Sequence, residues 1–145
     1  MSSYSDLSQK LQSSLNLTIP PISICLTGSV PEGIPMYDGV VPAGCSFWEK
    51  AVHGPFATAT PDHELCSIGV YTHNMAEPSS NYKPELETVL NVLNNLEYVR
   101  PEDLSSIAKL EHEVNYVLYS PLESTPLNPD VVLLFAQSQQ SLIIT

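Results

Sequence analysis

Short apolar runs alternate with amphipathic helical patterns along this sequence of 145 residues. Apolar runs bounded by turn residues are typical of β-strands, and they occur at 22–26, 56–60, 114–119 and 131–136. Helical spacing or helix-start residues occur between these runs, at 5–15, 45–54, 60–66 and 84–96. The order predicts a single α/β or α+β domain with a mixed sheet and flanking helices.

Two of these elements carry more specific expectations. The helix at 84–96 has a stripe of apolar side chains with three-four spacing, made by Leu86, Val89, Leu90, Leu93 and Leu96. Such a stripe is typical of a helix face that packs against the rest of the domain. The run at 131–136 is apolar without a break, which predicts a strand buried on both faces.

The charge balance is strongly acidic. Sixteen acidic residues against five basic ones give a formal net charge of −11. The resulting field repels phosphate backbones and anionic lipid headgroups, so we expect neither nucleic acid nor a membrane surface as a partner. Only 14% of the residues are charged, which favours a largely uncharged surface and therefore a homo-oligomer or a subunit of a larger assembly.

The chain has the features of a soluble cytoplasmic protein. Its N-terminus has no basic start and no apolar run of signal-peptide length, and no segment reaches the ~20 apolar residues that span a bilayer. Three cysteines make an odd number, and the reducing cytosol disfavours disulfides. We therefore expect free thiols, metal ligands or redox groups. Glycine-rich phosphate loops, a GxSxG elbow and an HExxH motif are all absent from the sequence.

The segment CSFWEKAVHGPFATATPDHELC, at 45–66, concentrates the residues that are able to carry chemistry. It begins at Cys45, ends at Cys66 and contains His53 and His63. Thiolate and imidazole are the side chains that bind soft transition metals. Cys25 differs from the other two cysteines because it lies inside an apolar strand, where a cysteine acts as a small buried hydrophobe.

Three segments resemble the DUF169 family, a functionally uncharacterised group of prokaryotic proteins. They are ISICLTGSVPEGIP, CSFWEKAVHGPFATATPDHELCSIG and NPDVVLLFAQSQQS, which together extend over most of the chain. The family pattern has matching positions here at Cys45, Ala51, Gly54, Asp62, His63, Cys66 and Gly69.

The resemblance implies one DUF169-like domain over residues 1–145, a cytoplasmic location and a pair of special cysteines, and it implies no reaction. Family members are usually longer, and their pattern continues into a helix and further sheet beyond SLIIT. The resemblance therefore implies either a short member of the family, truncated at its C-terminus, that folds alone, or one half of a split member whose sheet a partner subunit completes.

These observations favour a metal ion or an iron-sulfur cluster bound by Cys45 and Cys66, with His63 as an additional ligand. Each cysteine is expected near a helix start, where backbone N–H groups favour the thiolate form. One chain offers two such cysteines, and a two-fold dimer offers four, enough for a cluster shared across the axis. The expected role is in redox chemistry or electron transfer.

Three other interpretations stay open. A thiol enzyme or redox switch would use Cys66 or Cys45 as the reactive thiol, with His63 or His53 as the base. A non-catalytic subunit would dock on a larger redox enzyme. Both cysteines would also be explained as buried packing residues, although the polar neighbours of Cys66 disfavour a core position. Trp48 and His73 are expected to have structural roles, in the core and at a helix end.

Overall fold

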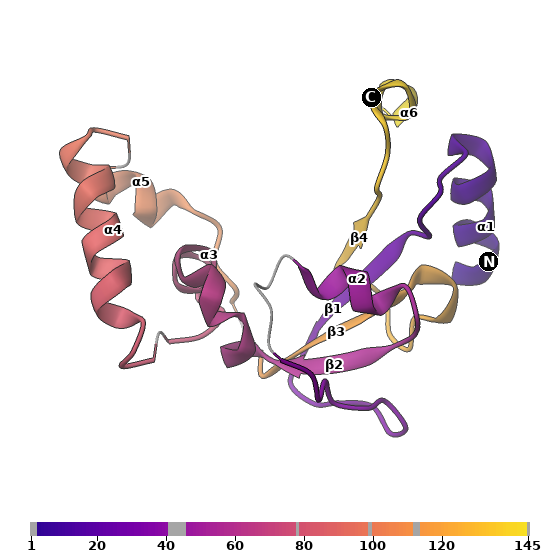
Figure 1. The fold of residues 1–145 in the computed structure, drawn as a ribbon, viewed down its shortest axis with the longest axis horizontal. Helices are drawn as coiled ribbons and strands as arrows, with labels where there is room; N and C mark the ends of the chain where they lie inside the picture. The colour runs from indigo at the N-terminus through magenta and orange to yellow at the C-terminus, as the bar shows by residue number, and fades with distance from the viewer. Residues whose placement is uncertain (1–2, 41–45, 78, 99, 112–113, 145) are drawn as a thin grey trace.

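The computed structural model describes residues 3–40, 46–77, 79–98, 100–111 and 114–144 (Figure 1). Its helices, short 3-10 helices (η) and strands follow the order α1 (Tyr4–Leu15), β1 (Ile22–Thr27), α2 (Phe47–Ala51), β2 (Phe56–Ala59), η2 (Thr60–Cys66), α3 (Ser67–Thr72), α4 (Lys83–Asn95), α5 (Pro101–Ser106), β3 (Tyr116–Pro121), η3 (Leu122–Ser124), β4 (Val131–Leu133) and α6 (Ser138–Ile144).

The four strands form one sheet in the order β2-β3-β1-β4. Each pair of neighbouring strands is antiparallel, so the expected α/β or α+β domain is confirmed as α+β. The sheet is antiparallel rather than mixed as expected, because no helical crossover returns the chain to a neighbouring strand in the same direction. Among the described residues, parallel pairing is confined to an isolated bridge between Met36 and Ala57.

The two faces of the sheet have different coverings. Alternate residues of a strand point to opposite faces, and Ile22, Phe56 and Tyr119 lie on the face covered by α2. Phe47 and Ala51 of α2 are fully buried there. The opposite face carries a smaller buried cluster of Cys25, Ala57 and Leu118.

The first helix confirms the expected amphipathic element at the N-terminal end of the chain. It begins at Tyr4 because Ser3 is the N-cap: the Asp6 backbone N–H donates to Ser3 Oγ at 3.2 Å, and Ser3 N–H donates to the Asp6 carboxylate at 3.1 Å. This reciprocal pair is a capping box. Ser8 and Leu15 of α1 are buried, and α1 packs against η3.

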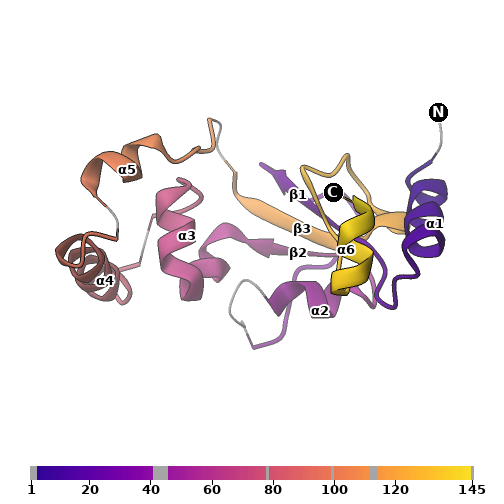
Figure 2. The ribbon, with the colours of Figure 1, turned by 90° about the horizontal axis from the view of Figure 1, so that it is seen from above.

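Residues 60–115 make a long excursion between β2 and β3, although these two strands are neighbours in the sheet. Figures 1 and 2 show that this excursion extends away from the sheet, with α3 near the sheet and α4 and α5 beyond it. The described residues include no helix with the length and apolar character needed to cross a bilayer.

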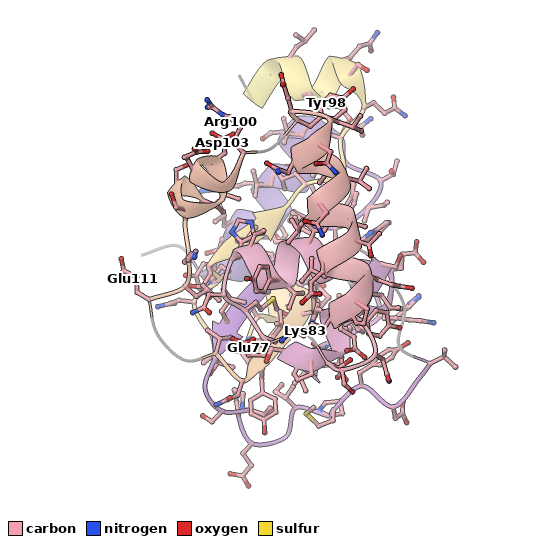
Figure 3. The ribbon with its side chains drawn as sticks, turned by 90° about the vertical axis from the view of Figure 1, so that its left-hand side faces the viewer. Glu77, Lys83, Tyr98, Arg100, Asp103 and Glu111 are labelled. Atoms are coloured by element: carbon pink, nitrogen blue, oxygen red, sulfur yellow. The ribbon has the colours of Figure 1, made fainter. Side chains whose placement is uncertain are left out.

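The packing expected for the α4 stripe is confirmed for only part of it. Leu86 is buried and Leu90 and Leu93 are half-buried, but Val89 and Leu96 are exposed, and 60% of Leu96 is accessible. The helix stands at the outer end of the excursion, where the described elements cover this face only in part (Figure 3). Its apolar spacing is helical, as expected, but the described fold leaves Val89 and Leu96 uncovered.

The last strand also differs from its prediction. β4 is limited to Val131–Leu133, lies at the sheet edge next to β1, and exposes Val131 and Val132. It is therefore not buried on both faces. The apolar run continues into a connection in which Phe135 packs on Trp48, with ring centroids 3.9 Å apart. Trp48 is thereby confirmed as a packing residue.

Candidate functional site

The segment that carries His63 and Cys66 is attached to the sheet at its start. It begins at Thr60, as the Thr-Pro-Asp sequence predicts, but as a 3-10 helix that passes into α3 after Cys66. Thr60 N–H donates to Asn115 O at 3.0 Å, and the Asp62 carboxylate accepts a hydrogen bond from Ala59 N–H at 3.0 Å. These two bonds connect the start of η2 to β2 and to the residue that precedes β3.

His63 is buried, with 5% of its surface accessible. Its Nδ1 lies 3.2 Å from Thr60 O, and its Nε2 lies 2.9 Å from the Tyr119 hydroxyl. A carbonyl oxygen only accepts hydrogen bonds, so Nδ1 carries the proton, and in the neutral ring Nε2 accepts from the Tyr119 O–H. Burial lowers the pKa of His63, because desolvation penalises the charged imidazolium. The ring is therefore held neutral and in one tautomer.

Aromatic rings surround this histidine. The ring centroid of Phe47 lies 4.9 Å from that of His63 and 5.5 Å from that of Tyr119. The ring of Phe56 stacks on that of Tyr119, with ring centroids 5.6 Å apart. Tyr37 meets Phe47 edge-on at 5.2 Å. The cluster excludes water from the imidazole, which is the physical cause of its lowered pKa.

The three cysteines have different settings. Cys25 is only 1% exposed, and its Sγ lies 3.7 Å from Thr125 Oγ1. Burial raises the pKa of the Cys25 thiol, which confirms its expected role as a small buried residue. Cys66 is a free, half-buried thiol at the junction of η2 and α3. Cys45 lies outside the described residues.

The fold brings together two described residues that are close in sequence to the predicted ligands. Phe47 follows Cys45 by two positions and packs directly on His63, which precedes Cys66 by three. In a 3-10 helix, residues three apart lie on the same side, so His63 and Cys66 share one side of η2. Among the described residues, no group of three or more histidine, cysteine and acidic side chains is arranged to hold a metal ion.

The remaining histidines lie elsewhere. His53 is exposed just after α2, where its N–H donates to Lys50 O. His73 caps the C-terminal end of α3, and this confirms its expected structural position. Tyr119, the partner of His63, was missed by sequence reasoning, because the two residues are 56 positions apart and no local pattern connects them.

The comparisons with known proteins identify a family. The sequence model of the DUF169 family, described as "Uncharacterised ArCR", matches residues 10–145. The chain belongs to the DUF169 family. No curated protein and no solved structure matches it. Membership in DUF169 confirms the resemblance of the cysteine-histidine segment and leaves its chemistry to be argued from the site.

Proposed function

We propose that this DUF169 protein binds a transition metal ion or an iron-sulfur cluster through the thiolates of Cys66 and Cys45, in a redox or electron-transfer role. The supporting observation is the packing of Phe47 on His63 at 4.9 Å, because these two residues are close in sequence to Cys45 and to Cys66. Cys66 is half-buried, a setting that gives a ligand both access to metal and shielding from solvent. A cytoplasmic location would keep both thiols reduced.

The contacts of His63 favour a supporting role for this residue over direct ligation. Its two ring nitrogens already lie within hydrogen-bonding distance of Thr60 O and the Tyr119 hydroxyl. A metal bond at either nitrogen would break one of these contacts, at a cost of about 0.5–1.5 kcal/mol for a typical hydrogen bond. Direct ligation by His63 stays a prediction that metal-site spectroscopy is able to test.

The same contacts disfavour the thiol-enzyme alternative in the resting arrangement. A general base has to lie within hydrogen-bonding reach of the proton that it takes. The basic nitrogen of His63 is Nε2, and the hydroxyl of Tyr119 already lies 2.9 Å from it. A thiol enzyme built on Cys66 would therefore need His63 to change partners first.

The ligand count requires more than one chain. Two cysteines do not complete a four-thiolate site, whereas a two-fold dimer supplies four. The apolar face of α4 supports self-association: exposed Val89, Val92 and Leu96 and half-buried Leu93 have i, i+3, i+4, i+7 spacing. Residues 88–96 include no charged side chain, so two acidic chains can meet there without burying carboxylates.

A second copy of this chain is therefore the proposed occupant of the α4 face. Antiparallel pairing would align the helix dipoles favourably. Light scattering should give the mass of a dimer for the wild type and of a monomer for Leu96→Glu. The control is Val40→Glu, at an apolar residue that is 92% exposed outside α4. A monomeric wild type would contradict the dimer.

Metal binding is tested by anaerobic purification, reconstitution with ferrous iron and sulfide, and visible absorption spectroscopy with iron and sulfide analysis. We expect charge-transfer absorption in the wild type and its loss in Cys45→Ser and Cys66→Ser. Cys25→Ala is the matched control, because Cys25 is buried in the sheet. Circular dichroism of each variant separates loss of metal from loss of fold. A colourless, metal-free wild type after reconstitution would overturn the proposal.

A further inference from the structure

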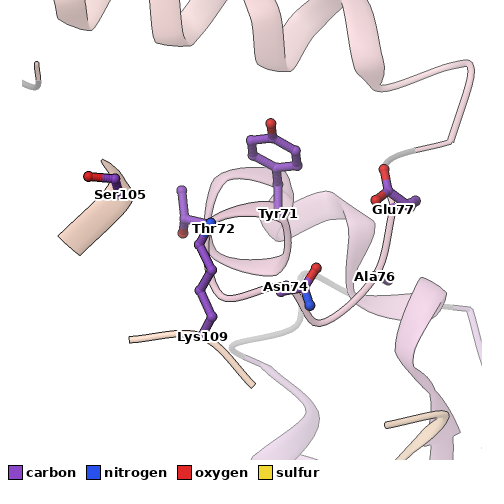
Figure 4. Close-up of a pocket in the computed structure, with 7 residues that line it drawn as sticks. All are labelled: Tyr71, Thr72, Asn74, Ala76, Glu77, Ser105 and Lys109. Carbon is purple, nitrogen blue, oxygen red and sulfur yellow. The ribbon is translucent and has the colours of Figure 1, made fainter. Parts of the chain in front are cut away.

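A second candidate site lies between the end of α3 and the segment after α5. A cavity of about 370 Å³ opens there, within the range of small-molecule pockets. It is lined by Tyr71, Thr72, Asn74, Ala76, Glu77, Ser105 and Lys109, which Figure 4 shows around the end of α3. Sequence analysis did not find this site, because its two walls are distant along the chain.

The first wall is a helix terminus with a defined geometry. Met75 N–H donates to Val70 O at 2.9 Å, and Asn74 N–H donates to Tyr71 O at 3.1 Å. Together with the φ of 56° at Asn74, these bonds form a Schellman motif that ends α3. The motif fixes the direction in which the chain continues to Glu77.

The second wall is attached to the first through one residue. His73 Nδ1 donates to Ala108 O at 2.8 Å, and Leu110 N–H donates to His73 O at 3.0 Å. Ala108 and Leu110 are the residues on either side of Lys109. The backbone that carries Lys109 is therefore held on both sides against the end of α3, and its side chain runs alongside Thr72 in Figure 4.

The cavity contains two opposite charges that do not neutralise each other. Within the described part of the chain, Arg100 and Asp103 form an ion pair, whereas neither Lys109 nor Glu77 takes part in one. Figure 4 shows Lys109 on one side of Tyr71 and Glu77 on the other. A bound molecule that contacts both needs a negative end for Lys109 and a positive end for Glu77, separated by several bonds.

We propose that this cavity binds a small zwitterion of amino-acid type, with its carboxylate at Lys109 and its ammonium at Glu77. A neutral but dipolar molecule also suits the charge of the whole chain, since a net charge of −11 repels a simple anion. The Tyr71 ring, between the two charged residues, offers an aromatic surface to the aliphatic part and the ammonium. Ser105 and Asn74 add hydrogen-bonding groups.

Isothermal titration calorimetry on the full chain tests the proposal with three probes of matched length: γ-aminobutyrate, butyrate and butylammonium. The zwitterion should bind, and each singly charged probe should bind at least about tenfold more weakly, since each lacks one charge-assisted contact. Lys109→Met and Glu77→Gln should each weaken zwitterion binding by a similar factor. Both residues are exposed, so these variants should keep the fold, and circular dichroism verifies this.

Lys50→Met is the matched control, because Lys50 is an exposed lysine on α2, outside the cavity lining. It should bind γ-aminobutyrate as the wild type does. Three results would each overturn the proposal: no zwitterion binding at millimolar concentration, equal affinity for butyrate, or unchanged affinity in both Lys109→Met and Glu77→Gln.

Discussion

Replacing Tyr119 with phenylalanine removes the hydroxyl that faces His63 Nε2 at 2.9 Å and changes little else in shape. Both residues are almost fully buried, with 5% of His63 and 6% of Tyr119 accessible, so no water replaces the lost donor. Leaving a buried acceptor unpaired costs about 1–3 kcal/mol. We therefore expect Tyr119→Phe to lower the free energy of unfolding by that amount.

Urea denaturation followed by circular dichroism measures this loss. With a slope of about 2 kcal/mol per molar urea, the midpoint should fall by about 0.5–1.5 M. Tyr116→Phe is the matched control, since Tyr116 is a half-buried tyrosine on the opposite face of the same strand. In a His63→Phe background, Tyr119→Phe should cost less, because no imidazole is left unpaired. Equal, small losses for Tyr119→Phe and Tyr116→Phe would refute the reasoning.

Three further results are expected. The pKa of His63 is lowered in the fold, so the unfolded chain takes up its proton first, and stability should fall as the pH drops below about 6.5, by at most about 1.4 kcal/mol per pH unit; urea midpoints at several pH values should show a smaller fall for His63→Phe. An aromatic disulfide reagent should modify Cys66 in the native protein and Cys25 only after unfolding, and fast modification that persists when Cys45 and Cys66 are both replaced by alanine would contradict this. Phe47→Ala should lower the free energy of unfolding by about 3–5 kcal/mol, because Phe47 is fully buried among aromatic rings; a loss under about 1 kcal/mol would show that the cluster does not support the fold.

The local parts of the fold were predictable from sequence. β1, β2 and β3 each lie within two residues of their predicted ends, because apolar runs between turn residues decide strand position locally. α4 likewise begins beside Pro84, as the helix-start residues predict. The direction of strand pairing was not predictable, since it depends on how the chain returns after residues 60–115.

Apolar pattern alone also misjudged burial. The α4 stripe and the run at 131–136 have the composition of buried elements, yet Leu96 and Val131 are exposed. Periodicity shows which face of an element is apolar and does not show whether another element covers it. The positions of α4 at the end of the excursion and of β4 at the sheet edge follow from tertiary arrangement.

The candidate site was predictable in its residue types and not in its contacts. The concentration of cysteine and histidine at 45–66 predicts where chemistry is carried, and the family match includes this segment. The neutral tautomer of His63 depends on Tyr119 from β3, and the cavity at Lys109 depends on hydrogen bonds to His73. Both are long-range contacts without a local sequence signal.

The most direct test of thiolate ligation is the X-ray absorption spectrum at the metal edge, recorded anaerobically on the reconstituted protein. The account predicts sulfur neighbours at about 2.3 Å, the length of a metal–thiolate bond, and their loss in Cys66→Ser. Tyr119→Phe should leave this sulfur shell in place, since both proposed thiolate ligands remain in that variant. A shell of nitrogen and oxygen neighbours alone, or a protein that retains no metal, would contradict the proposal that Cys66 and Cys45 form a metal centre.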